Sequence, residues 1–242
     1  MSIVTGYPER NHTYWETVAQ TRWGSYLSGI EKKAIYKAHR LLKKPTKALE
    51  IGAEGGRWSR LLSDLGWTMT CTDINEKTLA ICKERIPTAN CILVKANDNT
   101  LPCESESLSL VLCIEVPPAI QAKWFPYETF RVLQKDGLIV GVFWNRFSLR
   151  GLIAHIKSIF TGSFDYYKFS YLFWKKRVQC GGFTFIHEEG YCWFPFSRTS
   201  NSAMVPFFVS LEGFLGLRKL PLISPWVVFV AQKSSQSLNS QN

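Results

Sequence analysis

The stretch Ala48-Leu49-Glu50-Ile51-Gly52-Ala53-Glu54-Gly55-Gly56-Arg57-Trp58 decides the fold of this chain. Its apolar beginning is typical of a strand, its glycines of a tight turn, and the apolar spacing after Arg57 of a helix. Glycine lets a backbone take positive φ and approach a ligand closely, and the free N–H groups that begin a helix face that ligand. The stretch therefore predicts a strand, a turn and a helix that together carry a ligand site.

A second predicted strand, Met69-Thr70-Cys71-Thr72-Asp73-Ile74, ends in an acidic residue 17 positions after Gly56. In doubly wound α/β folds, an acid at the tip of the neighbouring strand binds the two hydroxyls of a ribose. We therefore expect Asp73 to bind the ribose of a nucleoside cofactor, with Ile74 beside it. Glu50 narrows the choice of cofactor, because a carboxylate is poorly placed beside a pyrophosphate but attracts an ammonium or sulfonium group.

Glu50 and the glycines Gly52, Gly55 and Gly56 resemble motif I of the class I S-adenosylmethionine-dependent methyltransferases. The usual form of that motif is Glu/Asp-x-Gly-x-Gly-x-Gly. The sequence departs from it at the middle glycine, where Glu54 stands.

Two further stretches resemble the same family. The run Glu128-Thr129-Phe130-Arg131-Val132-Leu133, followed by Lys135-Asp136-Gly137, is similar to its Glu-x-x-Arg-Val-Leu-x-x-Gly-Gly signature. In related methyltransferases, a Gly-Asp-x-x-x-Leu-Pro run contacts the adenine amino group. Counting back from Leu101-Pro102, Asn97 holds the place of the aspartate and Asp98 follows it.

The resemblance is strongest over residues 48–143 and is to the "type 11" branch, whose acceptors are small molecules or lipid precursors. It implies S-adenosylmethionine as the cofactor and S-adenosylhomocysteine as the product. The residues expected to bind this cofactor, from the motifs and from the ends of the predicted strands, are Glu50, Gly52, Ala53, Gly55, Gly56, Asp73, Ile74, Asn97, Asp98 and Glu115.

Helical and strand-like runs alternate through residues 48–143, which predicts a parallel sheet with right-handed crossovers. The expected fold is α/β: a doubly wound, seven-stranded and mostly parallel sheet, with an antiparallel C-terminal hairpin and helices on both faces. We expect residues 1–232 to form one domain and residues 233–242 to be disordered. The expected parts of the domain are an N-terminal cap and helix (1–47), the cofactor-binding core (48–143), an aromatic and basic lid insertion (145–182), and C-terminal strands with an apolar segment (183–232).

Two segments have two interpretations each. Residues 1–28 are rich in aromatic side chains and either fold over the cofactor cleft, as in resembling enzymes, or brace the core. Residues 204–219 are apolar with a basic end. This pattern is typical either of a surface that faces lipid or an acyl chain, or of an extra core helix under the sheet.

The chain of 242 residues carries a formal net charge of +10, which is unevenly distributed. Residues 48–143 are at −3, whereas residues 1–47 are at +6 and residues 144–242 are at +7. Basic flanks favour an anionic acceptor, an anionic membrane surface or nucleic acid as the partner. Nucleic acid is disfavoured, because Glu115-Val116-Pro117-Pro118 lacks the polar start and the final aromatic of the Asn/Asp-Pro-Pro-Tyr/Phe motif, and no RNA-binding domain is appended.

The seven cysteines form neither a Cys-x-x-Cys pair nor a His/Cys cluster with zinc spacing, so no metal site is predicted. Their use fits a reducing compartment. We see no signal peptide, and no uninterrupted apolar run approaches the roughly 18 residues of a membrane span. We therefore expect a cytoplasmic protein, for which the inner membrane surface is the place of any peripheral contact.

Methyl transfer from a sulfonium is an in-line displacement that alignment and desolvation accelerate, and a base is needed only when the acceptor is a hydroxyl or a carbon acid. The catalytic candidates are His155, in the predicted lid, and Glu115, which follows the fourth predicted strand at its carboxyl end. The leading interpretation is methyl transfer to a small-molecule or lipid-like O-, C- or N-nucleophile. The alternatives are methylation of nucleic acid or protein, and a non-catalytic cofactor-binding or scaffold protein, which Glu54 at a glycine place suggests.

Overall fold

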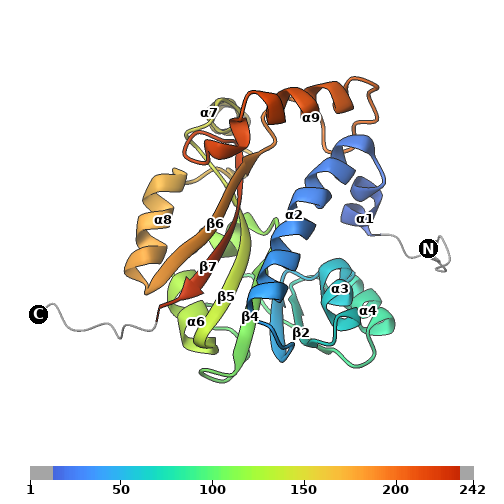
Figure 1. The fold of residues 1–242 in the computed structure, drawn as a ribbon, viewed down its shortest axis with the longest axis vertical. Helices are drawn as coiled ribbons and strands as arrows, with labels where there is room; N and C mark the ends of the chain where they lie inside the picture. Colours follow the sequence, from blue (N-terminus) through green and yellow to red (C-terminus); the bar gives the residue numbers. More distant parts are fainter. Residues whose placement is uncertain (1–12, 235–242) are drawn as a thin grey trace, which may run out of the picture.

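The computed structural model describes residues 13–234, which contain a seven-stranded sheet with the strand order β3-β2-β1-β4-β5-β7-β6 (Figure 1). Neighbouring strands from β3 to β5 pair in parallel, whereas β7 runs antiparallel between β5 and β6. This confirms the predicted α/β class and the mostly parallel sheet. The last two strands are antiparallel as expected, but a long connection joins them. The strands are β1 (Lys47–Ile51), β2 (Thr68–Asp73), β3 (Asn90–Leu93), β4 (Leu108–Cys113), β5 (Leu133–Trp144), β6 (Phe183–Tyr191) and β7 (Trp226–Lys233).

Helices cover both faces of the sheet and divide the core into two layers. Helices α2, α3 and α4 pack on one face, and α5, α6 and α8 pack on the other. In β4, Leu110 and Leu112 belong to the first layer while Leu108 and Val111 belong to the second, which is why this strand is apolar throughout. The helices are α1 (Tyr14–Ala19), α2 (Arg22–Leu41), α3 (Arg57–Asp64), α4 (Glu76–Arg85), α5 (Pro117–Ile120), α6 (Phe125–Val132), α7 (Leu149–Thr161), α8 (Tyr171–Cys180), α9 (Val205–Phe214) and the 3-10 helix η2 (Leu217–Lys219).

The segment expected to be a lid, residues 145–182, divides into two different parts. Helix α8 belongs to the second core layer, where Trp174 is fully buried and stacks on Phe143 with ring centroids 4.6 Å apart. Helix α7 contributes little to either layer, because its buried residues are Gly151 and Ser158. Tyr167, in the loop after α7, belongs to the first core layer, so the lid stays a prediction for α7 alone.

The two ends of the chain also differ from the expected boundaries. Strand β7 includes Lys233, so the first residue of the tail expected at 233–242 belongs to the sheet. Residues 235–242 lie outside the described residues, as do residues 1–12, the first part of the predicted cap.

Helix α9 overturns one of the two interpretations of its segment, because it is not a core helix under the sheet. Phe207 and Phe214 are both exposed, whereas Val205 and Glu212 are buried. Helices α7 and α9 lie together at the upper end of the molecule in Figure 1. Between residues 13 and 234, no helix has both the length and the hydropathy that crossing a membrane requires.

Candidate functional site

A cavity of about 320 Å³ opens at the carboxyl ends of the parallel strands. Ligands of open α/β sheets bind at that edge. The walls come from the residues that end β1, β2 and β4, from the segment after β3, and from Trp15 of α1. The volume lies in the range of small-molecule and cofactor sites.

The turn after β1 has the backbone that a glycine-rich motif requires. Gly52, Glu54 and Gly56 have φ angles of 70°, 49° and 77°, in the left-handed region that glycine tolerates best. At Gly52 space is also limiting, since a Cβ atom there would lie 2.5 Å from Cγ2 of Val116. Gly56 is the N-cap of α3. The turn thus brings the backbone to the cavity wall at Gly52.

Glu54, which replaces the middle glycine of the motif, lies beside the N-terminal helix α1. Its carboxylate interacts with the Thr13 side chain and with the backbone N–H of Trp15, at the beginning of α1. Burial raises the pKa of Glu54, and these hydrogen bonds oppose the rise. The side chain that departs from the motif therefore lies beside the beginning of α1.

Arg85 of α4 provides a second attachment for α1. Its Nη1 donates to Oε1 of Glu16 at 2.7 Å and to the carbonyl oxygen of Gly55 at 2.8 Å. The same guanidinium therefore joins α1 to the cofactor turn.

Both interpretations of the N-terminal segment hold, for different residues: Trp15 lines the cavity, while Trp23 is fully buried in the core.

Two acids lie at the tips of β1 and β2, on the cavity wall. Glu50 is buried and accepts a hydrogen bond from the Ser59 hydroxyl; burial, together with nearby Cys71, raises the pKa of Glu50 to about 8. The carboxylate of Asp73 accepts the N–H of Glu54 on Oδ2 and the N–H of Asn75 on Oδ1, each at 2.8 Å. A carboxylate has about four lone-pair sites, so Asp73 retains acceptor capacity for two hydroxyls.

A third acid, Glu115, follows β4 on the cavity wall and has a φ of 57°. Its carboxyl lies beside the fully buried carboxyl of Glu31. Burial and the charge of Glu31 raise the pKa of Glu115 well above its usual value, so the two acids share a proton. Apart from that proton, neither Glu115 oxygen has a hydrogen-bond partner among residues 13–234.

Two arginines balance the charge of this acid pair. Arg57 Nη2 lies 3.4 Å from Oε2 of Glu31. The guanidinium of Arg198 lies 4.6 Å from the ring centroid of Trp144 and exerts an attractive charge on Glu115. The acid end of the cavity is therefore surrounded by cations and aromatic rings.

These residues fit S-adenosylmethionine on three observations. The turn excludes side chains where a cofactor approaches the backbone, and Asp73 has free acceptor sites for ribose hydroxyls. The buried, unsatisfied carboxyl of Glu115 would gain a partner from a cationic ligand, and the cofactor carries both an ammonium and a sulfonium group.

The structure brings most of the predicted cofactor residues to one cavity, but not all of them. The predicted residues that line it are Glu50, Gly52, Ala53, Asp73, Ile74, Asp98 and Glu115. Gly55 and Gly56 face α1 and α4 instead, since a Cβ atom on them would meet Thr13 and Cys82. Asn97 is not part of the wall. Asp98 is part of the wall, and its carboxylate accepts the N–H of Lys95 at 2.8 Å.

His155, the other catalytic candidate, does not line the cavity. It lies in α7, where its ring contacts Arg146 and where Nδ1 is 2.8 Å from Oδ2 of Asp165. These contacts give the histidine a structural role, so the prediction of His155 as a base is not carried further.

Three tryptophans of the wall, Trp15, Trp58 and Trp124, were not among the residues expected to bind the cofactor, although Trp15 lies in a segment that was expected to reach the cleft. Trp58 could have been found, because it lies in the first turn of α3, directly after the motif. Trp15 and Trp124 belong to segments whose approach to the cavity depends on tertiary structure. Glu31 was missed because it begins a run of charged residues that is typical of a solvated helix face.

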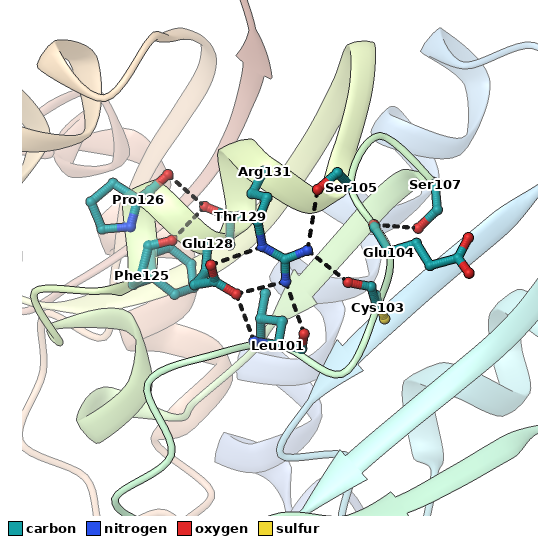
Figure 2. Close-up of polar contacts among 10 residues, drawn as sticks. All are labelled: Leu101, Cys103, Glu104, Ser105, Ser107, Phe125, Pro126, Glu128, Thr129 and Arg131. Atoms are coloured by element: carbon teal, nitrogen blue, oxygen red, sulfur yellow. Dashed lines mark hydrogen bonds and ion pairs between the residues drawn. The ribbon is translucent and has the colours of Figure 1, made fainter.

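The run in α6 that resembles the methyltransferase signature positions another part of the wall, as Figure 2 shows. Arg131 donates to the carbonyl oxygens of Leu101 at 2.9 Å and Cys103 at 2.8 Å, and its guanidinium also binds Glu128. Glu128 in turn accepts the N–H of Leu101 at 2.8 Å. Since Leu101 and Pro102 line the cavity, this pair holds the loop that closes one side of it.

Three cysteines that sequence spacing did not connect come together behind the turn. The sulfur atoms of Cys71, Cys82 and Cys91 all lie within 4.8 Å of one another. Cys71 donates to the Ser59 hydroxyl at 3.1 Å, and Cys82 packs against Gly56. The cluster thus supports the residues that hold Glu50.

Comparisons with known proteins agree with this geometry. Residues 49–141 match the family model described as "Methyltransferase domain". An uncharacterized methyltransferase-like protein of Schizosaccharomyces pombe is 28% identical over 160 residues, which cover 65% of this chain and 60% of the relative. The match thus spans about three fifths of that curated relative's length.

Solved structures share the fold at low sequence identity. A Thermotoga maritima methyltransferase, described as a possible histamine N-methyltransferase, has a TM-score of 0.56 at 17% identity, covering 91% of this chain and 93% of that one. A Listeria monocytogenes protein described as a putative S-adenosylmethionine-dependent methyltransferase has a TM-score of 0.59 at 11% identity, covering 85% and 98%. A geranyl diphosphate methyltransferase, solved with geranyl diphosphate and sinefungin, has a TM-score of 0.57 at 11% identity, covering 82% and 77%.

Proposed function

We propose that this chain, which carries a class I S-adenosylmethionine-dependent methyltransferase domain, moves a methyl group to a small-molecule or lipid-like acceptor bound beside Glu115. The attacking atom of the acceptor is an oxygen, nitrogen or carbon that can reach the cavity at the end of β4. The alternative acceptors, nucleic acid and protein, are separated from this proposal by the experiment below.

The observation that carries the proposal is the buried carboxyl of Glu115, whose partner is another acid, Glu31. A buried carboxyl that shares one proton with a second acid still lacks a donor, so such a group on a cavity wall favours a ligand that supplies a proton donor or a positive charge. The shared proton with Glu31 keeps the net charge of the pair low in the absence of a ligand.

The residues of the chain divide the chemical work. When bound, S-adenosylmethionine supplies an electrophilic methyl group on its sulfonium. Asp73 and Glu50 hold the ribose and the cationic end of the cofactor, and tryptophan side chains on the wall exclude water. A carboxylate oxygen of Glu115 accepts the proton that an acceptor hydroxyl, amine or carbon acid loses. Alignment of the two reactants in one cavity supplies the rest of the rate.

Charge near the acid pair supports an acceptor with an anionic group. Arg57 lines the cavity, and Arg198 lies 5.0 Å from the ring centroid of the wall residue Trp15. One structural neighbour was solved with geranyl diphosphate, an anionic isoprenoid, bound to it. That neighbour is an example of this fold accepting a lipid-like anion.

A transfer assay with methyl-labelled S-adenosylmethionine tests the proposal. The protein is incubated with lipid, small-molecule, nucleic-acid and protein fractions of an extract, each prepared with and without nuclease or protease treatment. We expect label in the lipid or small-molecule fraction. Label that nuclease or protease removes would support the alternative acceptors. Cofactor binding by calorimetry without any transfer would support the non-catalytic function.

A further inference from the structure

Helix α7 turns its apolar side outward. Leu149, Ile153, Ile156 and Phe160 recur at the spacing of one helical face, and all four are exposed, Phe160 by 85%. Its inward residues are small or polar, such as Ser158. An ordinary surface helix has the reverse arrangement, with its apolar stripe against the core. The outward face of α7 is therefore unfavourable in water.

Helix α9 repeats this arrangement. Glu212 is fully buried, with its carboxylate accepting from Tyr26 and, at 3.1 Å, from Arg218. On the outward side, Phe214 is 87% exposed and Phe207 is 58% exposed. Both helices have exposed apolar side chains, and although they are far apart in the sequence they lie at the same end of the molecule (Figure 1). We name this surface the α7–α9 face, defined by Leu149, Ile153, Ile156, Phe160, Phe207 and Phe214.

The α7–α9 face lies at the same end of the molecule as the cavity. Helix α7 follows the carboxyl end of β5, and the cavity lies at the carboxyl ends of strands parallel to β5. Arg198, in the segment before α9, lies 4.6 Å from the ring centroid of Trp144 and 5.0 Å from that of Trp15 in the cavity wall. A molecule that covers this face is therefore close to the site of methyl transfer.

The charges around the face indicate what covers it. Residues 146–170 and 198–223 contain seven Arg and Lys but two acids, Asp165 and Glu212. Asp165 is paired with His155 and Glu212 with Arg218. Apolar side chains bordered by cations complement an anionic lipid surface. Two copies of the same basic face would repel each other, so charge disfavours a second copy of the chain.

We propose that the α7–α9 face binds the surface of an anionic lipid bilayer and holds the cavity at that surface. The inference rests on the proposed function in one respect: the acceptor then reaches Glu115 from the lipid phase. Binding to the bilayer itself depends only on the exposed side chains of the two helices.

Co-sedimentation with vesicles tests the inference. We expect the wild-type protein to sediment with vesicles of phosphatidylglycerol and phosphatidylcholine far more than with phosphatidylcholine alone. The variant with Phe160→Ser and Phe214→Ser should bind the anionic vesicles more than tenfold more weakly, because the bilayer then buries two fewer aromatic side chains. The matched control is Tyr127→Ser, an exposed aromatic on α6, which should bind as the wild type does.

A second variant separates charge from apolar contact. Lys157→Gln, Lys168→Gln and Lys219→Gln together should weaken binding to anionic vesicles roughly a hundredfold and leave the weak binding to neutral vesicles unchanged. Wild-type protein that stays in the supernatant with anionic vesicles would overturn the inference. So would a solution dimer that the double phenylalanine variant converts to a monomer, because a second copy would then cover the face.

Failure of this inference is distinguishable from failure of the proposed function. Calorimetry with S-adenosylmethionine needs no vesicles, and vesicle binding needs no turnover. If the protein methylates a small molecule but does not bind vesicles, the proposed bilayer binding is contradicted and the proposed function is not. If the protein binds vesicles but methylates only nucleic acid or protein, the proposed acceptor is contradicted and the bilayer binding is not.

Discussion

The cofactor turn and the α7–α9 face differ in how they place polar and apolar side chains. At the turn, Glu50 and Asp73 sit at strand tips, each held by hydrogen bonds from the chain itself. On the α7–α9 face, a carboxylate is buried and phenylalanines face outward. In the first region the acids have hydrogen-bond partners, and only Glu115 needs a ligand. In the second region, apolar side chains are exposed to water, which is unfavourable. Variants of the turn should therefore leave vesicle binding intact, and variants of the α7–α9 face should leave cofactor binding intact.

The largest expected effect is on turnover and comes from Glu115→Gln. Loss of a positioned proton acceptor should lower kcat by about a hundredfold to ten-thousandfold. The dissociation constant of S-adenosylmethionine should change less than tenfold, and vesicle binding should not change. The matched control is Glu84→Gln, an exposed acid of α4. An unchanged kcat would contradict the role given to Glu115 and would leave alignment as the source of the rate.

The next largest effect is on cofactor affinity, from Asp73→Ala. Two hydrogen bonds from ribose hydroxyls to a charged acceptor, at about 1.5–3 kcal/mol each, predict at least a hundredfold weaker binding by calorimetry. Asp64→Ala, at the exposed end of α3, is the control. Because Asp73 also accepts two backbone N–H groups, thermal unfolding must show that the variant is folded. Unchanged affinity in a folded variant would rule out ribose binding by Asp73.

A smaller effect, on stability, is expected from Arg131→Ala. The carbonyl oxygens of Leu101 and Cys103 would each lose a charged donor, which should lower the free energy of unfolding by about 2 kcal/mol. Denaturant unfolding measures this loss, with Lys135→Ala, an exposed residue of β5, as the control. Cofactor affinity should also fall, since Leu101 lines the cavity. A fall in stability without a fall in affinity would show that the loop does not contact the cofactor.

The smallest effect is the pH dependence that Glu50 confers. Burial raises the pKa of Glu50 to about 8 from an unfolded value near 4.5, so the free protein holds this proton at pH 7. A cationic ligand favours the ionised form, so affinity should rise with pH up to about 8, by at most tenfold per unit, with proton release at pH 7. Calorimetry in buffers of different ionisation enthalpy detects that proton. Glu50→Gln should release fewer protons than the wild type.

The same pKa predicts the stability of the ligand-free protein. A carboxyl whose folded pKa is raised stabilises the fold fully below the unfolded value and loses that contribution as pH rises through the folded value. The contribution of Glu50 should therefore decline between about pH 4.5 and pH 8. A wild-type unfolding curve with the same pH slope as Glu50→Gln would show that Glu50 is not responsible.

The cofactor half of the fold was predictable because its signals are local. Strand, turn and acid spacing around Glu50 and Asp73 follow from chain geometry, and parallel strands must bring their carboxyl ends to one edge. Asn97 and Asp98 show the limit of local spacing: the motif predicted both as cofactor-binding residues, but only Asp98 lines the cavity. Which of two adjacent side chains faces a ligand depends on the loop that Arg131 holds.

The α7–α9 end was less predictable because periodicity gives the apolar face of a helix but not its direction. The spacing of Leu149, Ile153, Ile156 and Phe160 is the same whether the face is buried or exposed. The apolar stretch at 204–219 was equally compatible with a core helix. Glu212, which is buried and paired with the half-buried Arg218, fixes the direction of α9, and that pair exists only in the folded structure.

The central claim is that Glu50 and Asp73 hold opposite portions of one S-adenosylmethionine molecule at adjacent strand tips. A crystal structure with S-adenosylhomocysteine bound tests it most directly. The account predicts ribose hydroxyls within hydrogen-bond distance of the Asp73 carboxylate and the amino-acid portion on the side of Glu50, with the sulfur turned toward Glu115. A ligand bound elsewhere, or bound here with its ribose away from Asp73, would contradict it.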